Sequence, residues 1–325
     1  MKFPRLRTIL LVPLIGFALV YVAGVIMLAM DDRAVTTFEG IAARHETIAI
    51  FGASGTAGDG ILKAALADPG IKKIHVITRR ATARIEEGVA SGKVQMTTHM
   101  GYLDYSSIRD QIAEADAVYW AIGISSLGVD EKTYGMIHVD FPVAFVKEWT
   151  SVSNKPDISF HFISSSDISE DSGAMWAREK VRAEKALFGF ADGSTLRVIA
   201  YRPDYIGPTK EEAHLGQNML YWFFRPVGAA VRARQIGQAM IEVTARGAEF
   251  ENGTKLGTRS IHRYSDAYER RQSLVSPSAS VGRLREPRRA PAAVTLEVAA
   301  LRSPSNRLRR GVRPWLPLQF YFIGR

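Results

Sequence analysis

The sequence predicts an α/β fold built around a doubly wound parallel sheet. Strand-like and helix-like segments alternate along residues 46–255, and several of the strands are short apolar runs of the kind that a sheet buries on both faces. A glycine-rich turn also joins the first strand to the helix that follows it. Parallel sheets of this type bind ligands at the carboxyl ends of their strands, so the residues that follow each strand are the candidates for function.

The first strand, Thr47–Phe51, runs into a turn in which Gly52, Gly55 and Gly58 have the spacing G-x-x-G-x-x-G. Gly52 permits a tight reversal, Gly55 a close approach of phosphates to the backbone, and Gly58 close packing of the new helix on the strand. Because unpaired N–H groups at a helix N-terminus attract anions, the turn predicts a Rossmann-like dinucleotide site. An ordinary turn with glycines for packing alone is the alternative. The predicted cofactor residues of this loop are Gly52, Ser54, Gly55, Thr56 and Gly58.

The second strand, residues 74–77, bears on which cofactor is bound. Enzymes that prefer NAD usually carry an acidic residue at its end, whereas this chain has Thr78, Arg79 and Arg80 there. Guanidinium groups suit the 2′-phosphate of NADP, so Arg79 and Arg80 favour NADP over NAD. Two arginines that simply face solvent are the alternative.

The remaining strands continue the pattern. They are predicted at residues 94–100, 117–122, 158–163 and 197–201, with helices at 108–114, 136–150 and 235–241. Asp104 follows the third strand and is placed either near an adenine or in an exposed loop. Gly123 ends the fourth strand and lets backbone approach the cofactor. Residues 205–235 are expected to form a small lobe on the substrate side.

Several of these residues together resemble a known family. The glycine turn, Ser164-Ser165 at a strand end, the segment Trp176–Lys180, Glu184 and Arg202-Pro203 look like an atypical short-chain dehydrogenase/reductase, similar to the NAD(P)H-binding proteins typified by the HIV Tat-interactive oxidoreductase. The resemblance covers residues 46–255 and implies an oxidoreductase acting on a small carbonyl or alcohol. In that family a Ser orients the substrate oxygen, and a Tyr-x-x-x-Lys pair exchanges the proton and holds the nicotinamide ribose.

The chain departs from the family pattern at the tyrosine. Trp176 stands in its place, while Ser165 and Lys180 keep theirs, so the resemblance gives Ser165, Lys180 and Trp176 as the catalytic set. An indole N–H donates a hydrogen bond but does not titrate, so the usual proton donor is missing. Tyr205 and Tyr134 are candidates to replace it. The alternative is a catalytically impaired, regulatory nucleotide-binding protein.

The histidines and the lack of cysteine narrow the chemistry further. His138 could act as a base, although a helix-surface histidine is the simpler interpretation. The seven histidines show no ligand spacing, so no metal site is predicted. The absence of cysteine excludes disulfides and thiolate catalysis.

The N-terminal segment is apolar. Residues 8–30 carry no charge, which predicts a transmembrane anchor over residues 1–33, a linker over 34–45 and a single-pass membrane protein. Lys2, Arg5 and Arg7 precede the apolar run and favour a cytosolic N-terminus, but the side that the domain faces stays open. A cleaved signal peptide is the alternative.

The composition changes at Leu256. Residues 256–325 contain fourteen Arg, no Lys, four acidic residues and six of the fourteen Pro, and their net charge of +10 accounts for the +9 of the whole chain. This composition predicts an irregular, disordered tail. Nucleic-acid binding by the tail is not expected, although its arginines suit phosphates. An out-of-frame origin of the segment is an equal alternative to a native disordered tail. The expected partner is a small-molecule substrate, and the oligomeric state stays open.

Overall fold

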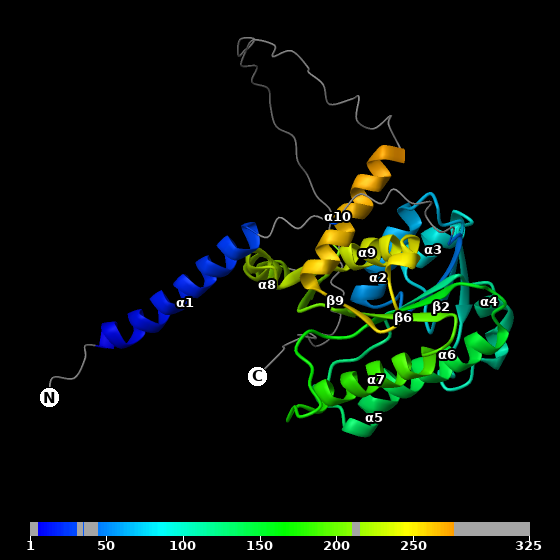
Figure 1. The fold of residues 1–325 in the computed structure, drawn as a ribbon, viewed down its shortest axis with the longest axis horizontal. Helices are drawn as coiled ribbons and strands as arrows, with labels where there is room; N and C mark the ends of the chain where they lie inside the picture. The colour runs from blue at the N-terminus through cyan, green and yellow to red at the C-terminus, as the bar shows by residue number, and fades with distance from the viewer. Residues whose placement is uncertain (1–5, 31–34, 36–44, 210–214, 276–325) are drawn as a thin grey trace, which may run out of the picture.

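A seven-stranded parallel sheet with helices on both faces forms the body of the protein (Figure 1). The computed structural model describes residues 6–30, 35, 45–209 and 215–275. The strand order is β3-β2-β1-β4-β5-β6-β9, and every neighbouring pair is parallel. The predicted doubly wound α/β fold is therefore confirmed.

The strands of this sheet begin and end as follows: β1 Thr47–Phe51, β2 Lys73–Thr78, β3 Val94–Thr98, β4 Ala117–Trp120, β5 Ile158–Ile163, β6 Leu196–Arg202 and β9 Thr254–Gly257. The main helices are α1 Leu6–Ala29, α2 Thr56–Ala67, α3 Ala83–Ala90, α4 Arg109–Ala113, α5 Glu131–Gly135, α6 Phe141–Val152, α7 Met175–Ala191, α8 Leu215–Phe224, α9 Ala233–Ala245 and α10 Thr258–Val275. A π-helical turn, Met136–Asp140, joins α5 to α6. A second, two-stranded sheet, β7 Tyr205–Gly207 and β8 Ala230–Arg232, forms the small lobe together with α8.

The two faces of the sheet carry separate apolar cores. Alternate residues of β1 point to opposite sides: Ile48 and Ile50 pack with α2, α9 and α10, whereas Ala49 and Phe51 pack with α4, α6 and α7. All four side chains are fully buried. Burial on both faces explains why these strands read as continuous apolar runs and not as alternating ones.

The composition change at residue 256 does not mark the end of the fold, because β9 spans it and α10 follows it. The carboxylate of Glu242 in α9 is fully buried and accepts hydrogen bonds from the Nε atoms of Arg246 and Arg271, both at 2.7 Å. Gln272 Nε2 also donates to Asp68 Oδ2 at 2.8 Å. Residues 256–275 thus belong to the folded unit, contrary to the predicted tail, and residues 276–325 lie outside the described part of the chain.

The N-terminal helix α1 extends from the body and meets the small lobe near α8 (Figure 1). The rings of Phe17 and Phe223 stack with centroids 6.0 Å apart, and Tyr21 Oη donates to the carbonyl oxygen of Phe223 at 2.8 Å. Within the part of the chain that the structure describes, no helix combines the length and the apolarity that a span of about 20 residues requires. The predicted transmembrane anchor and single-pass membrane localisation are therefore wrong.

Candidate nucleotide and active site

The glycine turn lies at the carboxyl end of β1 and is held by its own backbone. Gly52 has φ +77°, and a Cβ atom there would lie 2.6 Å from the backbone of Ala121. A Cβ atom on Gly58 would lie 2.0 Å from the Gly52 carbonyl oxygen. Among the described residues, a Cβ atom at Gly55 would meet just this oxygen, at 3.5 Å, which is an ordinary contact. Packing within the protein thus accounts for Gly52 and Gly58 and leaves Gly55 unexplained.

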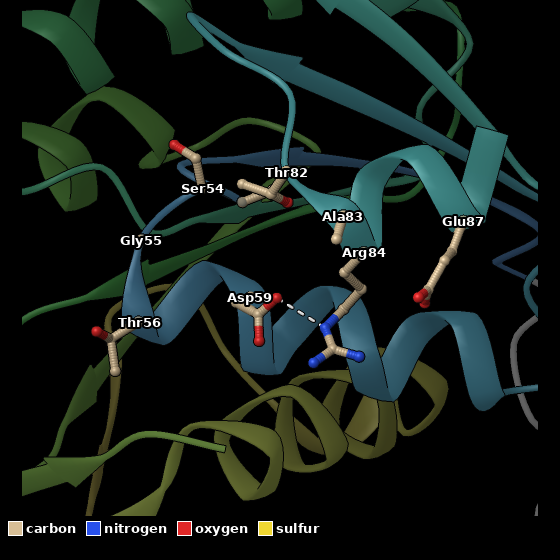
Figure 2. A pocket seen from close by; sticks show the side chains of 9 residues that line it. Ser54, Gly55, Thr56, Asp59, Thr82, Ala83, Arg84 and Glu87 are labelled. Atoms are coloured by element: carbon tan, nitrogen blue, oxygen red, sulfur yellow. Dashed lines mark hydrogen bonds and ion pairs between the residues drawn. The ribbon is translucent and has the colours of Figure 1, made fainter. Parts of the chain in front are cut away.

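A pocket of about 250 Å³ opens beside this turn (Figure 2). It lies between the turn, the first turns of α2 and the start of α3. Its lining residues are Ala53, Ser54, Gly55, Thr56, Asp59, Thr82, Ala83, Arg84 and Glu87. Three residues predicted from the sequence, Ser54, Gly55 and Thr56, therefore share one cavity.

Arg84 is a charged residue of this pocket that the sequence analysis missed. Its Nε atom donates to Asp59 Oδ1 at 2.7 Å, and the pair joins α3 to α2 (Figure 2). The side chain of Asp59 is buried, and its second oxygen has no hydrogen-bond partner among the described residues. Arg84 comes four residues after Arg80, and only the folding of α3 against α2 brings it to the cavity.

The two predicted arginines take different positions. Both are exposed, and Arg80 Nη2 lies 3.5 Å from the carbonyl oxygen of Ser54, at the edge of the pocket. Burial raises the pKa of the Tyr102 phenol, and the charge of the nearby Arg79 partly opposes this. Asp104 is in an exposed loop, where its Oδ1 accepts from the backbone N–H of Ser106 at 2.9 Å and its pKa falls.

Gly123 follows β4 and lies over the ring of His138. A Cβ atom on Gly123 would come within 2.8 Å of His138 Cε1. His138 is buried, so the helix-surface interpretation is wrong. Its Nε2 lies 3.3 Å from both the N and the O of Ile124. Burial, then the charge of Lys180, lowers its pKa well below 6.5, so the imidazole is neutral and ties down the loop after β4.

The carboxyl end of β5 carries the two serines. The backbone N–H of Ser164 donates to the carbonyl oxygen of Tyr201 at 2.7 Å and continues the pairing with β6. The hydroxyl group of Ser164 is buried and has no partner in the described part of the chain. Ser165, the predicted catalytic serine, is partly exposed.

Lys180 in α7 reaches the same strand end. Its Nζ donates to the carbonyl oxygen of Ile163 at 3.0 Å and lies 5.2 Å from the centroid of the Phe162 ring. The amine therefore contacts the residue that lies two positions before Ser165 in the chain. Trp176, one helical turn earlier on α7, is partly exposed.

Lys180 is buried, and no carboxylate among the described residues forms an ion pair with it. Glu184 is the next acidic residue along this face of α7, but both of its oxygens accept hydrogen bonds from Arg202 of β6, one of them from Nε at 2.9 Å. Burial lowers the pKa of Lys180 from 10.5 to about 7, and the charge of Glu184 only partly opposes this. The amine can therefore gain and lose a proton near neutral pH.

The two candidate tyrosines lie on other elements. The ring of Tyr134 in α5 is buried against His138, with centroids 4.1 Å apart. Tyr205 in β7 follows the end of β6 and is thus at the same edge of the sheet as Ser165. Burial raises the pKa of the Tyr205 phenol, which makes it a weaker acid.

No protein-family model matches the chain, and no curated sequence does either. Solved structures do share its fold. A short-chain dehydrogenase/reductase from Saccharomyces cerevisiae is 13% identical, with a TM-score of 0.51 over 66% of this chain and 96% of that one. An oxidoreductase of the short-chain dehydrogenase/reductase family from Burkholderia thailandensis is 12% identical, with a TM-score of 0.52 over 66% and 92% of the two chains.

A 3-oxoacyl-[acyl-carrier protein] reductase from Brucella melitensis, solved in complex with NAD, is 15% identical, with a TM-score of 0.51 over 68% of this chain and 98% of that one. At such identities the likeness concerns the fold, and the Tat-interactive subgroup stays a prediction. The chain has the fold of the short-chain dehydrogenase/reductases.

Proposed function

We propose that the protein is an NAD(P)(H)-dependent oxidoreductase that acts on a small carbonyl or alcohol, with NADP(H) as the preferred cofactor. The observation that carries this proposal is the arrangement of one sheet edge. The glycine-turn pocket lies at the carboxyl end of β1, and Ser165 and the Ile163 carbonyl oxygen that Lys180 contacts lie at that of β5. Sheets of this type bind nucleotides at that edge.

The residues around the turn fit a dinucleotide. Gly55 precedes α2 without a side-chain cap, so the first N–H groups of the helix are available to an anion. The protein itself has room for a Cβ atom at Gly55, so the glycine is explained by a ligand that approaches the backbone. A structure of the same fold was solved with NAD.

Two guanidinium groups support the choice of NADP(H). Arg80 lies at the rim of the pocket and Arg84 in its wall. A 2′-phosphate would receive planar hydrogen-bond donors from both, and Asp59 holds the Arg84 guanidinium in place.

The cofactor, when bound, supplies or accepts the hydride. Ser165 would donate a hydrogen bond to the substrate oxygen, and Lys180 would bind the ribose hydroxyls next to the strand end. Trp176 would form an aromatic wall of the site without exchanging protons. The small lobe, with the exposed Trp222 of α8, would complete the substrate side.

A second function is favoured by Trp176 alone. Without a phenol at this position, the protein could bind the nucleotide and regulate a partner without turnover. The variant Trp176→Tyr distinguishes the two. It raises the rate of an enzyme that lacks its best acid, whereas a regulatory protein keeps binding NADPH with no turnover.

Cofactor binding is tested by fluorescence titration of the full chain with NADPH and NADH. We expect tighter binding of NADPH and loss of binding in Gly55→Asp, because its carboxylate repels the phosphates. Gly55→Ala should fold normally, since its Cβ atom has ordinary contacts within the protein, and should also weaken nucleotide binding, because that atom lies where the phosphates approach the backbone. Arg80→Ala and Arg84→Ala should each weaken NADPH binding about 10-fold, the equivalent of about 1.4 kcal/mol, and leave NADH unchanged. Failure of the folded native chain to bind either nucleotide refutes the proposal.

A further inference from the structure

We propose that Lys180 is itself the proton-transfer group of this active site, with its Nζ donating the proton that a substrate oxygen gains when a carbonyl is reduced. The inference rests on the proposed oxidoreductase function and adds to it the residue that does the work of an acid. It starts from the pairing of Trp176, which cannot titrate, with a buried amine one helical turn further along α7.

The position of the amine suits this role. Only 7% of Lys180 is exposed, and one of its protons is directed to the carbonyl oxygen of Ile163. Ser164 and Ser165 follow Ile163 directly. The Ser164 hydroxyl is buried without a partner among the described residues, so a polar group that can receive or pass on a hydrogen bond lies at the same strand end.

The charges that face Lys180 leave it free to lose its proton. On its own helix, Glu184 is occupied by Arg202 from β6. From the π-helical turn, the imidazole of His138 interacts with Lys180 but is neutral. No described residue forms an ion pair with the ammonium. Burial lowers its pKa to about 7, where a group serves well both as acid and as base at neutral pH.

The other candidate acids are less suitable. Tyr205 titrates above the usual range of a phenol, because burial raises its pKa. Nε2 of His138 is occupied by the backbone of Ile124, and its pKa is too low for it to hold a proton at neutral pH.

The carbonyl carbon receives a hydride from a reduced nicotinamide, and the π electron pair moves to the oxygen. The oxygen takes a proton from Lys180 Nζ, so that the N–H bond breaks and an O–H bond forms. Lys180 is left as a neutral amine and takes up a proton from solvent before the next turnover. Oxidation of an alcohol runs through the same atoms in reverse.

The first measurement needs no turnover. In the full chain without cofactor, competitive labelling with acetic anhydride across a pH series reports the pKa of each lysine from the yield of labelled peptide. We expect Lys180 to titrate near pH 7. Lys185, on the same helix with a side chain that is 65% exposed, serves as the control for the labelling of an exposed lysine. An ordinary pKa for Lys180 overturns the proposal.

The second measurement follows NADPH oxidation with 9,10-phenanthrenequinone as the carbonyl probe. The native kcat should fall as the pH rises above 7, because the amine then lacks its proton. Lys180→Arg keeps the positive charge but cannot release a proton, and Lys180→Met removes both, so each should lose about 100-fold or more in kcat. The dissociation constant for NADPH should change by much less in Lys180→Arg, and Lys185→Arg should behave like the native protein.

The outcomes separate this proposal from the one on which it rests. A kcat of Lys180→Arg with the native value and pH profile shows that another group supplies the proton. NADPH binding by the native chain without quinone reduction also overturns the inference and favours the regulatory function. A native chain that binds no NADPH rejects the oxidoreductase itself, whatever the labelling experiment shows.

Discussion

Replacement of Lys180 by methionine measures the cost of the buried amine without any cofactor. Burial lowers the pKa of Lys180 to about 7 in the folded protein, against 10.5 for an ordinary lysine. Between these two pH values the unfolded chain binds a proton that the folded chain does not. Native stability therefore rises with pH across this window, and the penalty for folding is complete below pH 7.

The size of the effect follows from the two pKa values. Each pH unit between the two pKa values corresponds to about 1.4 kcal/mol. Burying the charged amine of Lys180 therefore lowers the free energy of unfolding at pH 6 by at most about 5 kcal/mol. The variant loses the hydrogen bond to Ile163, which is worth about 1 kcal/mol. We expect Lys180→Met to be more stable than the native protein by about 4 kcal/mol at pH 6, with a gain that shrinks by about 1.4 kcal/mol per pH unit above pH 7.

Urea unfolding, followed by tryptophan fluorescence at pH 6, 7, 8 and 9, gives this difference directly. Lys185→Met is the matched control, because the Lys185 side chain is 65% exposed and its removal should change stability little at any pH. A stability difference for Lys180→Met that does not vary with pH would refute the reasoning. A loss of stability at pH 6 would do the same.

Three further predictions concern the fold. Gly58→Ala should lower the free energy of unfolding by about 3 kcal/mol in urea titrations, because its Cβ atom meets the Gly52 carbonyl oxygen at 2.0 Å, while Gly55→Ala stays near the native value. Glu242→Gln should cost about 3–5 kcal/mol in the same assay, since it leaves two guanidinium groups short of a buried partner, and a neutral result would contradict this. Burial lowers the pKa of His161 well below 6.5, so the free energy of unfolding should fall as the pH drops below about 6.5. The fall should be less steep in His161→Asn. Equal slopes of the native and variant proteins in acid unfolding curves would contradict this prediction.

Local signals explain why much of the sheet could be predicted. Six of its seven strands were expected within a few residues of their observed bounds, because apolar runs punctuated by glycine are visible in the sequence itself. The missed strand, β9, has four residues, of which only Leu256 is buried. A short edge strand with one buried side chain has no recognisable period.

The C-terminal helix shows the limit of composition. The segment Thr258–Val275 resembled a disordered tail because it is rich in arginine. In the fold, Arg271 reaches the buried Glu242, which is 29 residues away along the chain. Such a long-range contact fixes the position of α10 on the body, but no pattern in the neighbouring sequence indicates it. The same holds for Arg84, whose position in the pocket depends on the packing of α3 against α2.

The order of the elements determines which residues meet at the carboxyl edge of a parallel sheet, so the sequence alone placed Gly55 and Ser165 there, and the family resemblance added Lys180. Only the tertiary structure decided the chemistry of Lys180. Its spacing from Glu184 is that of a helical ion pair. Arg202 from β6 instead takes both carboxylate oxygens, because a guanidinium fork matches a carboxylate better than a single ammonium does. The lysine is left buried beside a carbonyl oxygen, with a pKa near 7.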